Sequence, residues 1–369
     1  MSGAADAGAG AAARRRVAGV DAVRVAAIVA IVAIHTTPFE RAGWPIGAAP
    51  DLATLLNQAT RFAVPFFLVV AGFFWARKVT EAGEVRAPTR ALVRRALLVW
   101  AAWWMAYLLP WNLVDALAHG PLGPLKVVWW NLAQVARRPA IALLEGTSPH
   151  LWFLVALAGC AALSAAFMHR GARRGLIVLA AALYAVGLAG QAYPQAPFGF
   201  HIDPDLRNGH LFALAFFVTG AGLHRRGPAR GWLPLGAALA AGGLALHLAE
   251  SWAAHRWWGQ PLQRDYVAGT YLYGTGVALM ALSGLARPAP SLAPGGGGGL
   301  RWQTLGAPGP AVLGIYASHM VFVALLKPLD RQLTGAAWWE VAYVAAVFAL
   351  AWGTTRALAR FRVTRPMVT

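Results

Sequence analysis

Three ionisable residues, Asp21, Arg24 and His35, interrupt the sequence DAVRVAAIVAIVAIH, a stretch otherwise apolar enough to cross a bilayer. The eleven steps from Arg24 to His35 complete three helical turns plus roughly 20°, so all three side chains share one helix face. The imidazole lies about 16 Å beyond the guanidinium along that face. A neutral imidazole can take a proton from a hydroxyl group and return it, as general acid–base catalysis requires. The alternative is a packing histidine, but ionisable groups inside membranes tend to mark catalytic sites or pathways.

A second histidine, His319, lies in the late apolar stretch GIYASHMVFVALL, one turn after Tyr316. If this segment enters the membrane near Pro310, His319 lies roughly 14 Å inside, at a depth close to that of His35. Two histidines at matched depth predict a shared cavity. The alternative is a packing histidine bonded to a carbonyl of a neighbouring helix. We take His35, Asp21 and His319 as the candidate catalytic residues.

An arginine cluster, formed by Arg90, Arg94 and Arg95, opens the third apolar stretch, TRALVRRALLVW. Arg90 and Arg94 are four residues apart and therefore share a helix face. Together with Arg24, the cluster could present several guanidinium groups to phosphates that arrive from the cytoplasm. Arginines at an inner membrane boundary also anchor topology, and this alternative stays open for the cluster. Arg24 lies on the histidine face and is favoured for ligand contact.

The composition shows what must position these residues. Of 369 residues, 58% are hydrophobic and 12% are charged, and the mean hydropathy is +0.52. Such a chain is a polytopic helical membrane protein. The net charge of +18 comes from arginines between apolar stretches, which fits membrane topology rather than nucleic-acid binding. The single cysteine, Cys160, excludes an internal disulfide, no metal-ligand cluster is apparent, and the charged first stretch does not resemble a cleavable signal peptide.

The hydropathy pattern predicts an all-α bundle of about ten membrane-spanning helices. If the N-terminus is inside, roughly two thirds of the 32 Lys and Arg residues fall on the inner side, so both termini are expected in the cytoplasm. We divide the chain into a disordered basic tail (1–17), a membrane domain (18–357) and a basic cytoplasmic tail (358–369). The predicted spans are 18–38, 60–76, 91–113, 149–168, 175–191, 208–223, 232–250, 265–285, 310–328 and 337–357.

Two spans carry further signals. In the second, FAVPFFLVVAGFFW, Pro65 permits a kink and Gly72 permits close approach of another helix. The fourth opens with HLWFLVAL, where His150 and Trp152 either belong to an interfacial belt or line an acceptor cleft.

The connecting segments are varied. The outside loop 114–148 contains Trp129 and Trp130 and is expected to hold a helix on the membrane surface. Segment 192–207 is turn-rich and a candidate lid, and the run Gly295–Gly299 is a flexible linker.

Taken together, these motifs resemble those of the acyltransferase-3 family of integral-membrane O-acyltransferases. The resemblance rests on Asp21, Arg24 and His35, on VPFFLVVAGFF, on the arginine cluster, on the Trp-Phe-Leu after His150, and on Tyr316 followed by His319. The motifs extend over essentially the whole chain. Two positions depart from the family pattern: Ala71 replaces a frequent serine, and the arginines at 90, 94 and 95 are spaced differently.

The resemblance implies transfer of an acyl group, most often acetyl, from cytoplasmic acyl-coenzyme A to a hydroxyl of a surface glycan, a lipid-linked intermediate or a related acceptor. His35 would be the catalytic residue, and Arg24 with Arg90, Arg94 and Arg95 would hold the phosphates of the coenzyme. We expect a bacterial inner-membrane protein that acts alone or with a separate extracytoplasmic partner enzyme, because no hydrolase-like domain is appended. The alternatives are a transporter or acyl-relay protein that uses the same buried charges, and a non-catalytic scaffold.

Overall fold

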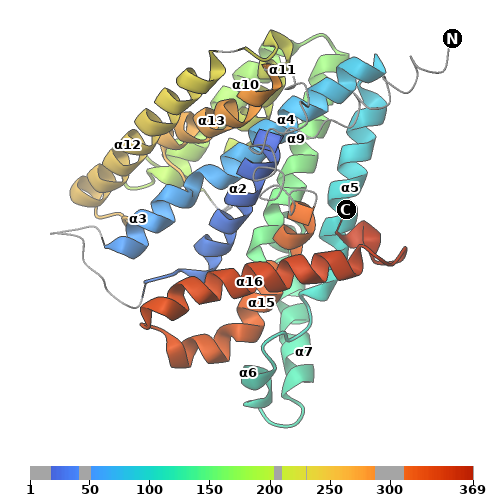
Figure 1. The fold of residues 1–369 in the computed structure, drawn as a ribbon, viewed down its shortest axis with the longest axis vertical. Coiled ribbons are helices and arrows are strands. Elements are labelled where there is room, and N and C mark those ends of the chain that lie inside the picture. Colours follow the sequence, from blue (N-terminus) through green and yellow to red (C-terminus); the bar gives the residue numbers. More distant parts are fainter. Residues whose placement is uncertain (1–17, 41–50, 203–209, 230, 287–310, 369) are drawn as a thin grey trace, which may run out of the picture.

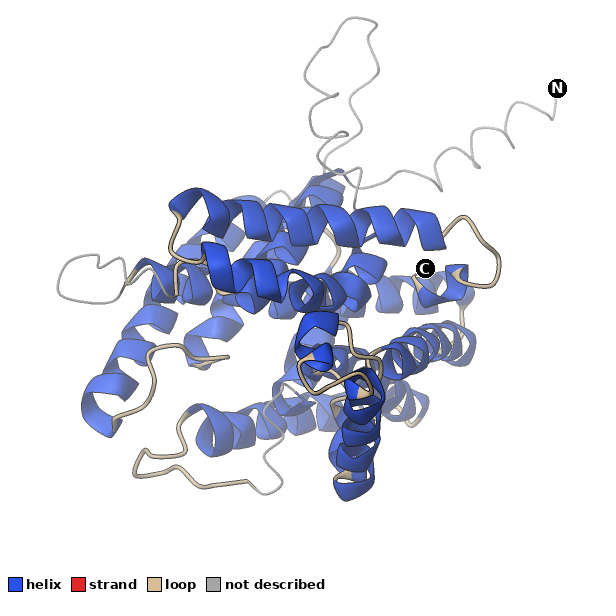
Figure 2. Ribbon diagram, turned by 90° about the horizontal axis from the view of Figure 1, so that it is seen from below, coloured by secondary structure: helices blue, strands red, loops and turns tan. Residues whose placement is uncertain are grey.

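The structure, a computed structural model, describes residues 18–40, 51–202, 210–229, 231–286 and 311–368. All secondary structure in these ranges is helical, which confirms the predicted all-α class (Figure 2). The predicted tail 1–17, the linker Gly295–Gly299 and part of the candidate lid 192–207 lie outside the described residues.

A long helix lies at each of the ten predicted spans (Figure 1). Seven helical segments of the described ranges are long and apolar enough to cross a membrane, so the chain is a multi-pass membrane protein. Helices α11 and α13 are shorter, and α5 carries the arginine cluster, so the count of ten and the inner location of both termini stay predictions. The long helices are α2 (Ala18–Thr36), α4 (Ala63–Ala82), α5 (Arg86–Ala106), α9 (Trp152–His169), α10 (Arg173–Gly187), α11 (His210–Arg226), α12 (Trp232–Trp258), α13 (Ala268–Leu282), α15 (Val312–Leu333) and α16 (Ala337–Leu358).

Helix α2 runs through the middle of the bundle, where α4, α13, α15 and α16 pack around it (Figure 1). Ala27, Ile28 and Val32 of this helix are fully buried. Beyond its last residue, Thr37 and Phe39 adopt positive φ angles of 46° and 67°, which are unfavourable for residues other than glycine. The Phe39 amide donates to the carboxylate of Glu340 on α16 (2.8 Å), so α16 holds the chain in place directly after His35.

Helices α4 and α11 approach each other closely through two glycines. A Cβ atom at Gly72 would overlap the carbonyl oxygen of Phe217, and one at Gly220 would overlap that of Val69. Small residues at helix crossings let backbones come together in membranes. The close approach predicted at Gly72 is thereby confirmed.

The second span begins earlier than the sequence suggested. Helix α3 (Leu52–Ala59) starts at an Asp51 cap, whose carboxylate accepts from the Thr54 amide (2.8 Å). It continues through the 3₁₀ turn η1 (Thr60–Phe62) into α4, giving one helical segment from Leu52 to Ala82. The helical segment therefore starts eight residues before the predicted start at residue 60, and residues 52–59 add about two turns before Arg61.

The loop 114–148 contains α6 (Leu113–Leu117), α7 (Gly123–Arg137) and α8 (Pro139–Leu144), and α6 and α7 project from the bundle (Figure 1). Trp129 of α7 is 70% exposed, as a helix on a membrane surface requires, although the contact with lipid stays a prediction. The carboxylate of Asp115 ties α6 to α15 through two hydrogen bonds from Arg331 (2.7 and 2.8 Å).

The described part of the predicted basic tail 358–369 contacts the bundle, and its location in the cytoplasm stays a prediction. Trp103 of α5 donates from its indole nitrogen to the Met367 carbonyl (2.9 Å), and Val368 is fully buried. The apolar residues at the end of this basic segment make these contacts with the bundle.

Candidate active site

Three histidines meet inside the bundle. His35 comes from the end of α2, His150 from the 3₁₀ turn η2 (Pro149–Leu151) before α9, and His319 from α15. The ring centroid of His319 lies 5.1 Å from that of His35 and 5.0 Å from that of His150, and the other two rings are 6.2 Å apart. The structure therefore brings the rings of His35 and His319 together, but only His35 lines the adjoining cavity, so the predicted cavity is not shared by both histidines. It adds His150, for which the sequence left two interpretations open.

Hydrogen bonds assign a different capacity to each ring. His319 donates from Nδ1 to the Tyr316 carbonyl (2.6 Å), which leaves the lone pair on Nε2, and this buried atom has no partner among the described residues. His150 has both nitrogens engaged: Nε2 donates to the Ala317 carbonyl (3.4 Å) and Nδ1 accepts from the Ser148 hydroxyl (2.9 Å). His35 makes no hydrogen bond to a described residue. A free ring nitrogen for proton transfer is thus available at His35 and at His319.

Two buried tyrosines fix this arrangement. Tyr316 donates its hydroxyl to the carbonyl of His150, and Tyr107, the C-cap residue of α5, donates to the carbonyl of Ala317 (2.7 Å). These bonds connect η2, α5 and α15. Because every element that carries a histidine is held by packing or by such bonds, the rings are preorganised rather than placed on mobile loops.

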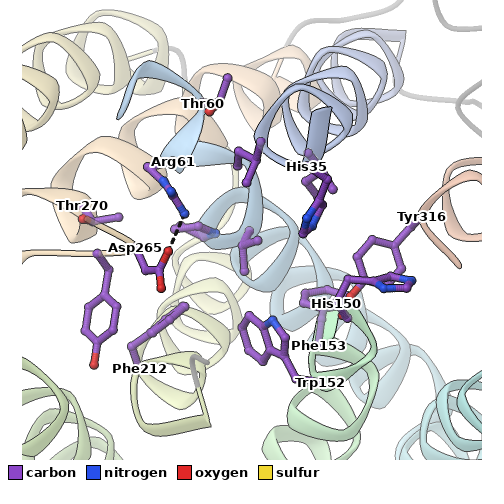
Figure 3. Close-up of a pocket in the computed structure, with 15 residues that line it drawn as sticks. His35, Thr60, Arg61, His150, Trp152, Phe153, Phe212, Asp265, Thr270 and Tyr316 are labelled. Atoms are coloured by element: carbon purple, nitrogen blue, oxygen red, sulfur yellow. Dashed lines mark hydrogen bonds and ion pairs between the residues drawn. The ribbon is translucent and has the colours of Figure 1, made fainter. Parts of the chain in front are cut away.

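A cavity of about 130 Å³, which we call the histidine cavity, opens beside His35 and His150 (Figure 3). Across the cavity, Arg61 forms an ion pair with Asp265 (2.8 Å). The Arg61 side chain is 14% exposed and that of Asp265 is 56% exposed, so the carboxylate marks the rim and the guanidinium lies deeper. The rest of the wall is largely apolar and aromatic, with Trp152, Phe153, Phe212, Tyr266 and Tyr316 among its members.

A second cavity of about 360 Å³, the arginine cavity, contains Arg24 and Arg95 in a wall that is otherwise apolar apart from one tyrosine hydroxyl. It shares Ile31, Phe153 and Tyr316 with the histidine cavity. Because these three residues line both spaces, the two cavities adjoin, and we call the three side chains the partition. Positions 24, 31 and 35 follow one face of α2, so the face predicted from helical spacing connects the two cavities.

The predicted anion-binding residues divide into two groups. All three arginines of α5 are exposed, but only Arg95 lines the arginine cavity together with Arg24. The shared face of Arg90 and Arg94 therefore points away from the cavity, and the rotation of α5 selects Arg95. Sequence spacing defines neighbours on a helix but not which face meets the bundle.

Asp21, predicted among the catalytic residues, accepts a hydrogen bond from Arg24 (2.9 Å). It lies about 20 Å along α2 from His35, so it cannot contact that ring. The Arg24 guanidinium also lies over the ring of Phe74, 5.5 Å from its centroid. Asp21 is therefore a partner that orients Arg24 through an ion pair between residues three apart on the helix.

Neighbouring histidines raise the question of a metal ion. His150 has no free lone pair, so the three rings do not offer three ligand atoms. Within the described ranges, no group of three or more His, Cys, Asp or Glu side chains has an arrangement that would hold a metal. The free ring nitrogens of His35 and His319 permit proton transfer, beside a cavity lined by two arginines.

Fold and site together define a class: a multi-pass helical membrane protein in which a cluster of three histidines adjoins a cavity with two arginines. Comparison with known families agrees, because the acyltransferase-3 family model, described as an acyltransferase domain, matches residues 17–356. The chain belongs to this family.

Two curated relatives come from enterococci. A serine/alanine racemase of Enterococcus gallinarum is 27% identical over 215 residues, covering 55% of this chain and 28% of that protein. An amino-acid racemase of Enterococcus faecalis is 28% identical over 216 residues, covering 55% of this chain and 27% of that protein. The chain thus matches only about a quarter of each relative's length. No solved structure matches the chain.

Sequence reasoning missed Arg61 and Asp265. Arg61 stood at the start of the second predicted span and Asp265 at the start of the eighth, and neither was assigned a role. A usable signal was present: Asn57 and Arg61 are four residues apart, a spacing that lets an amide oxygen hold a guanidinium on a helix.

Proposed function

We propose that this protein is a membrane O-acyltransferase that moves an acyl group from cytoplasmic acyl-coenzyme A to an acceptor hydroxyl, with acetyl as the expected group. The observation that carries the proposal is the adjacency of the two cavities, which share Ile31, Phe153 and Tyr316. A donor held on one side can thereby bring its thioester to a base on the other. The bacterial inner membrane is the location that this reaction implies.

The donor fits the arginine cavity. Guanidinium groups bind phosphate through forked, charge-assisted hydrogen bonds, and Arg24 and Arg95 supply two such forks. The apolar wall beyond them suits the uncharged pantetheine arm. In this arrangement the charged end of coenzyme A stays near the arginines while the thioester reaches the partition beside Tyr316.

His35 suits the role of general base. Its ring lines the histidine cavity, and its nitrogens are not committed to any described residue. It would take the proton of the acceptor hydroxyl as the oxygen attacks the thioester carbonyl, and then return that proton to the departing thiolate. His319 supports it with the lone pair on Nε2.

The acceptor would enter past Asp265 at the rim. Aromatic walls with polar groups at the opening suit a glycan or a lipid-linked sugar, in keeping with the acceptors expected from the resemblance. The names of the two racemase relatives add a hydroxyl-bearing amino acid such as serine to the acceptors to be screened. A separate extracytoplasmic enzyme would complete the transfer where the final acceptor cannot reach the cavity.

The test uses membrane vesicles that contain the full chain and are supplied with radiolabelled acetyl-coenzyme A. We expect label to appear in glycan or lipid fractions, with mass spectrometry of cells with and without the gene identifying the acceptor. His35→Ala should abolish this transfer, whereas His224→Ala, which removes a histidine near the α4–α11 contact and outside both cavities, should not. Transfer by His35→Ala at the normal rate would sink the proposal.

A transporter or acyl-relay protein is the second candidate, favoured by the presence of two cavities on either side of a partition. Its signature is solute flux into proteoliposomes without consumption of coenzyme A thioester. Flux that survives His35→Ala while no acyl transfer is measurable would decide for this alternative.

A further inference from the structure

Arg61 is a charged residue in the wall of the histidine cavity that has no role in the proposed donor binding or proton transfer. It lies inside the helical segment from Leu52 to Ala82, where an ionisable side chain is costly to retain. Figure 3 shows its guanidinium opposite His35, with Asp265 beside it. A purely structural ion pair is a weak reason to keep a charge in such a place.

The guanidinium has more donors than partners. A guanidinium group carries five N–H bonds. Nε and Nη2 donate to the side-chain oxygen of Asn57 (3.1 and 2.6 Å), and Nη1 donates to Asp265 (2.8 Å). Three of the five are thus engaged, and the other two have no partner among the described residues.

The hydroxyl groups of the cavity wall already donate their hydrogen bonds to acceptors other than a substrate. Thr60 donates to the Asn57 carbonyl (2.6 Å), Tyr266 donates to Gln191 (2.9 Å), and Tyr316 donates to the His150 carbonyl. Thr270 is paired with His247 (2.8 Å), whose Nε2 donates to the side-chain oxygen of Gln58 (2.7 Å); the Thr270 hydroxyl is therefore the donor to Nδ1. None of these four hydroxyls is available for negative charge that develops in the cavity.

We propose that Arg61 stabilises the oxyanion of the acyl-transfer reaction, an inference that rests on the proposed function. The acceptor oxygen forms a bond to the thioester carbon while its proton passes to His35. The carbonyl π electrons move onto the carbonyl oxygen. The resulting alkoxide accepts hydrogen bonds from the two N–H groups of Arg61 that have no other partner among the described residues. Collapse restores the C=O bond, breaks the C–S bond, and returns the proton from His35 to the thiolate, giving ester and free coenzyme A.

Asn57 and Asp265 are positioning residues for this donor. Asn57 lies one helical turn before Arg61 and fixes the plane of the guanidinium through two bonds to one oxygen. Asp265 neutralises the cation in the resting state. A donor that is already oriented needs no reorganisation when charge develops, and such preorganisation is the main source of oxyanion stabilisation.

The test measures how tightly the protein in nanodiscs binds two coenzyme A analogues. Neither analogue can donate an acyl group. One is S-acetonyl-coenzyme A, a neutral ketone that resembles the thioester ground state. The other is a coenzyme A thioether that ends in a methylphosphonate, a tetrahedral anion. Arg61→Gln should weaken binding of the phosphonate about 10²-fold, in line with the loss of one oxyanion donor. Binding of the ketone should change by less than about twofold, because uncharged carbonyls gain little from the cation.

A matched control is Arg77→Gln, which removes an exposed arginine ion pair (Arg77–Glu81, 2.7 Å) elsewhere on α4 and should leave both affinities unchanged. Arg61→Lys keeps the charge without the fork, and Asn57→Ala keeps Arg61 without its clamp. Both should weaken phosphonate binding alone, by about 10-fold. They also test the inference if Arg61→Gln does not fold.

Equal weakening of both analogues in the Arg61 variants would overturn the inference, since Arg61 would then act on binding in general. Unchanged phosphonate affinity would overturn it as well. If the normal protein binds neither analogue, the proposed function itself fails, and that result is distinct from a loss confined to Arg61 variants.

Discussion

Replacement of His319 tests the chemistry of the histidine cluster. Its Nε2 lone pair is buried without a partner, and its ring centroid lies 5.1 Å from that of His35. A small rotation of His35 would let that ring donate one N–H to Nε2, which fixes its tautomer and leaves the other nitrogen free as the base. Catalytic hydrogen bonds are often long before substrate binds. His319 is then a positioning residue.

The expected loss follows from this role. General base catalysis contributes about 10²- to 10⁴-fold, so His319→Ala should lower acyl transfer by that factor, or about 3 to 5 kcal/mol of barrier. His319→Gln should retain part of the rate, because the amide oxygen of the glutamine side chain can accept a hydrogen bond from the His35 ring. Both variants lose the Nδ1 bond to the Tyr316 carbonyl (2.6 Å), so both should lower the melting temperature in detergent.

The assay is transfer of label from radiolabelled acetyl-coenzyme A in membrane vesicles, normalised to folded protein. His224→Ala is the control, because this histidine lines neither cavity. The reasoning would be refuted if His319→Ala kept the normal rate per folded molecule. It would also be refuted if the Gln and Ala variants lost activity strictly in proportion to their loss of stability, since a structural role alone would produce that result.

Three further predictions follow from other parts of the structure. Arg24→Gln and Arg95→Gln should each weaken binding of coenzyme A at least about 10-fold in titration calorimetry, and unchanged affinity would place the phosphates elsewhere. Gly72→Ala should destabilise the protein by roughly 1 to 3 kcal/mol in thermal unfolding, whereas Gly222→Ala, which meets open space, should not. Hydrogen bonds from its arginine partner on α15 hold the pKa of Asp115 below its usual range. The ionised carboxylate stabilises the α6–α15 contact, and this stabilisation is fully present above the pKa that Asp115 has in the unfolded chain, near 4. It is lost as the pH falls through the lower pKa that Asp115 has in the folded protein. Hydrogen exchange in α6 should therefore rise in acid, and Asp115→Asn should remove that pH dependence.

Local spacing was enough to predict part of the site. The shared face of Arg24 and His35 follows from helix geometry, and α2 preserves it because the helix is uninterrupted. The meeting of His35 with His319 followed from depth counting and from the cost of burying ionisable groups. The i, i+3 pairing of Asp21 with Arg24 is likewise a local property.

Properties that depend on how helices rotate and where they start could not be predicted in this way. Arg95 rather than Arg90 lines the arginine cavity because tertiary packing sets the rotation of α5. Arg61 was given no role because it stood at the start of a predicted span, whereas the helical segment begins eight residues earlier, at Leu52. His150 enters the site because the turn Pro149–Leu151 directs the chain inward before α9, a change of direction that hydropathy does not record.

The partition formed by Ile31, Phe153 and Tyr316 also bears on the energy supply of the cell. An enzyme that passes groups through a membrane must not let protons follow, because each charge that leaks dissipates about 2.3 kcal/mol per 100 mV of membrane potential. Two of the three side chains have no polar group, and the hydroxyl of Tyr316 is committed to the His150 carbonyl. These side chains offer no free hydrogen-bonding group to a chain of water molecules. Substitution of Phe153 by serine should make vesicles leaky to protons even where acyl transfer survives.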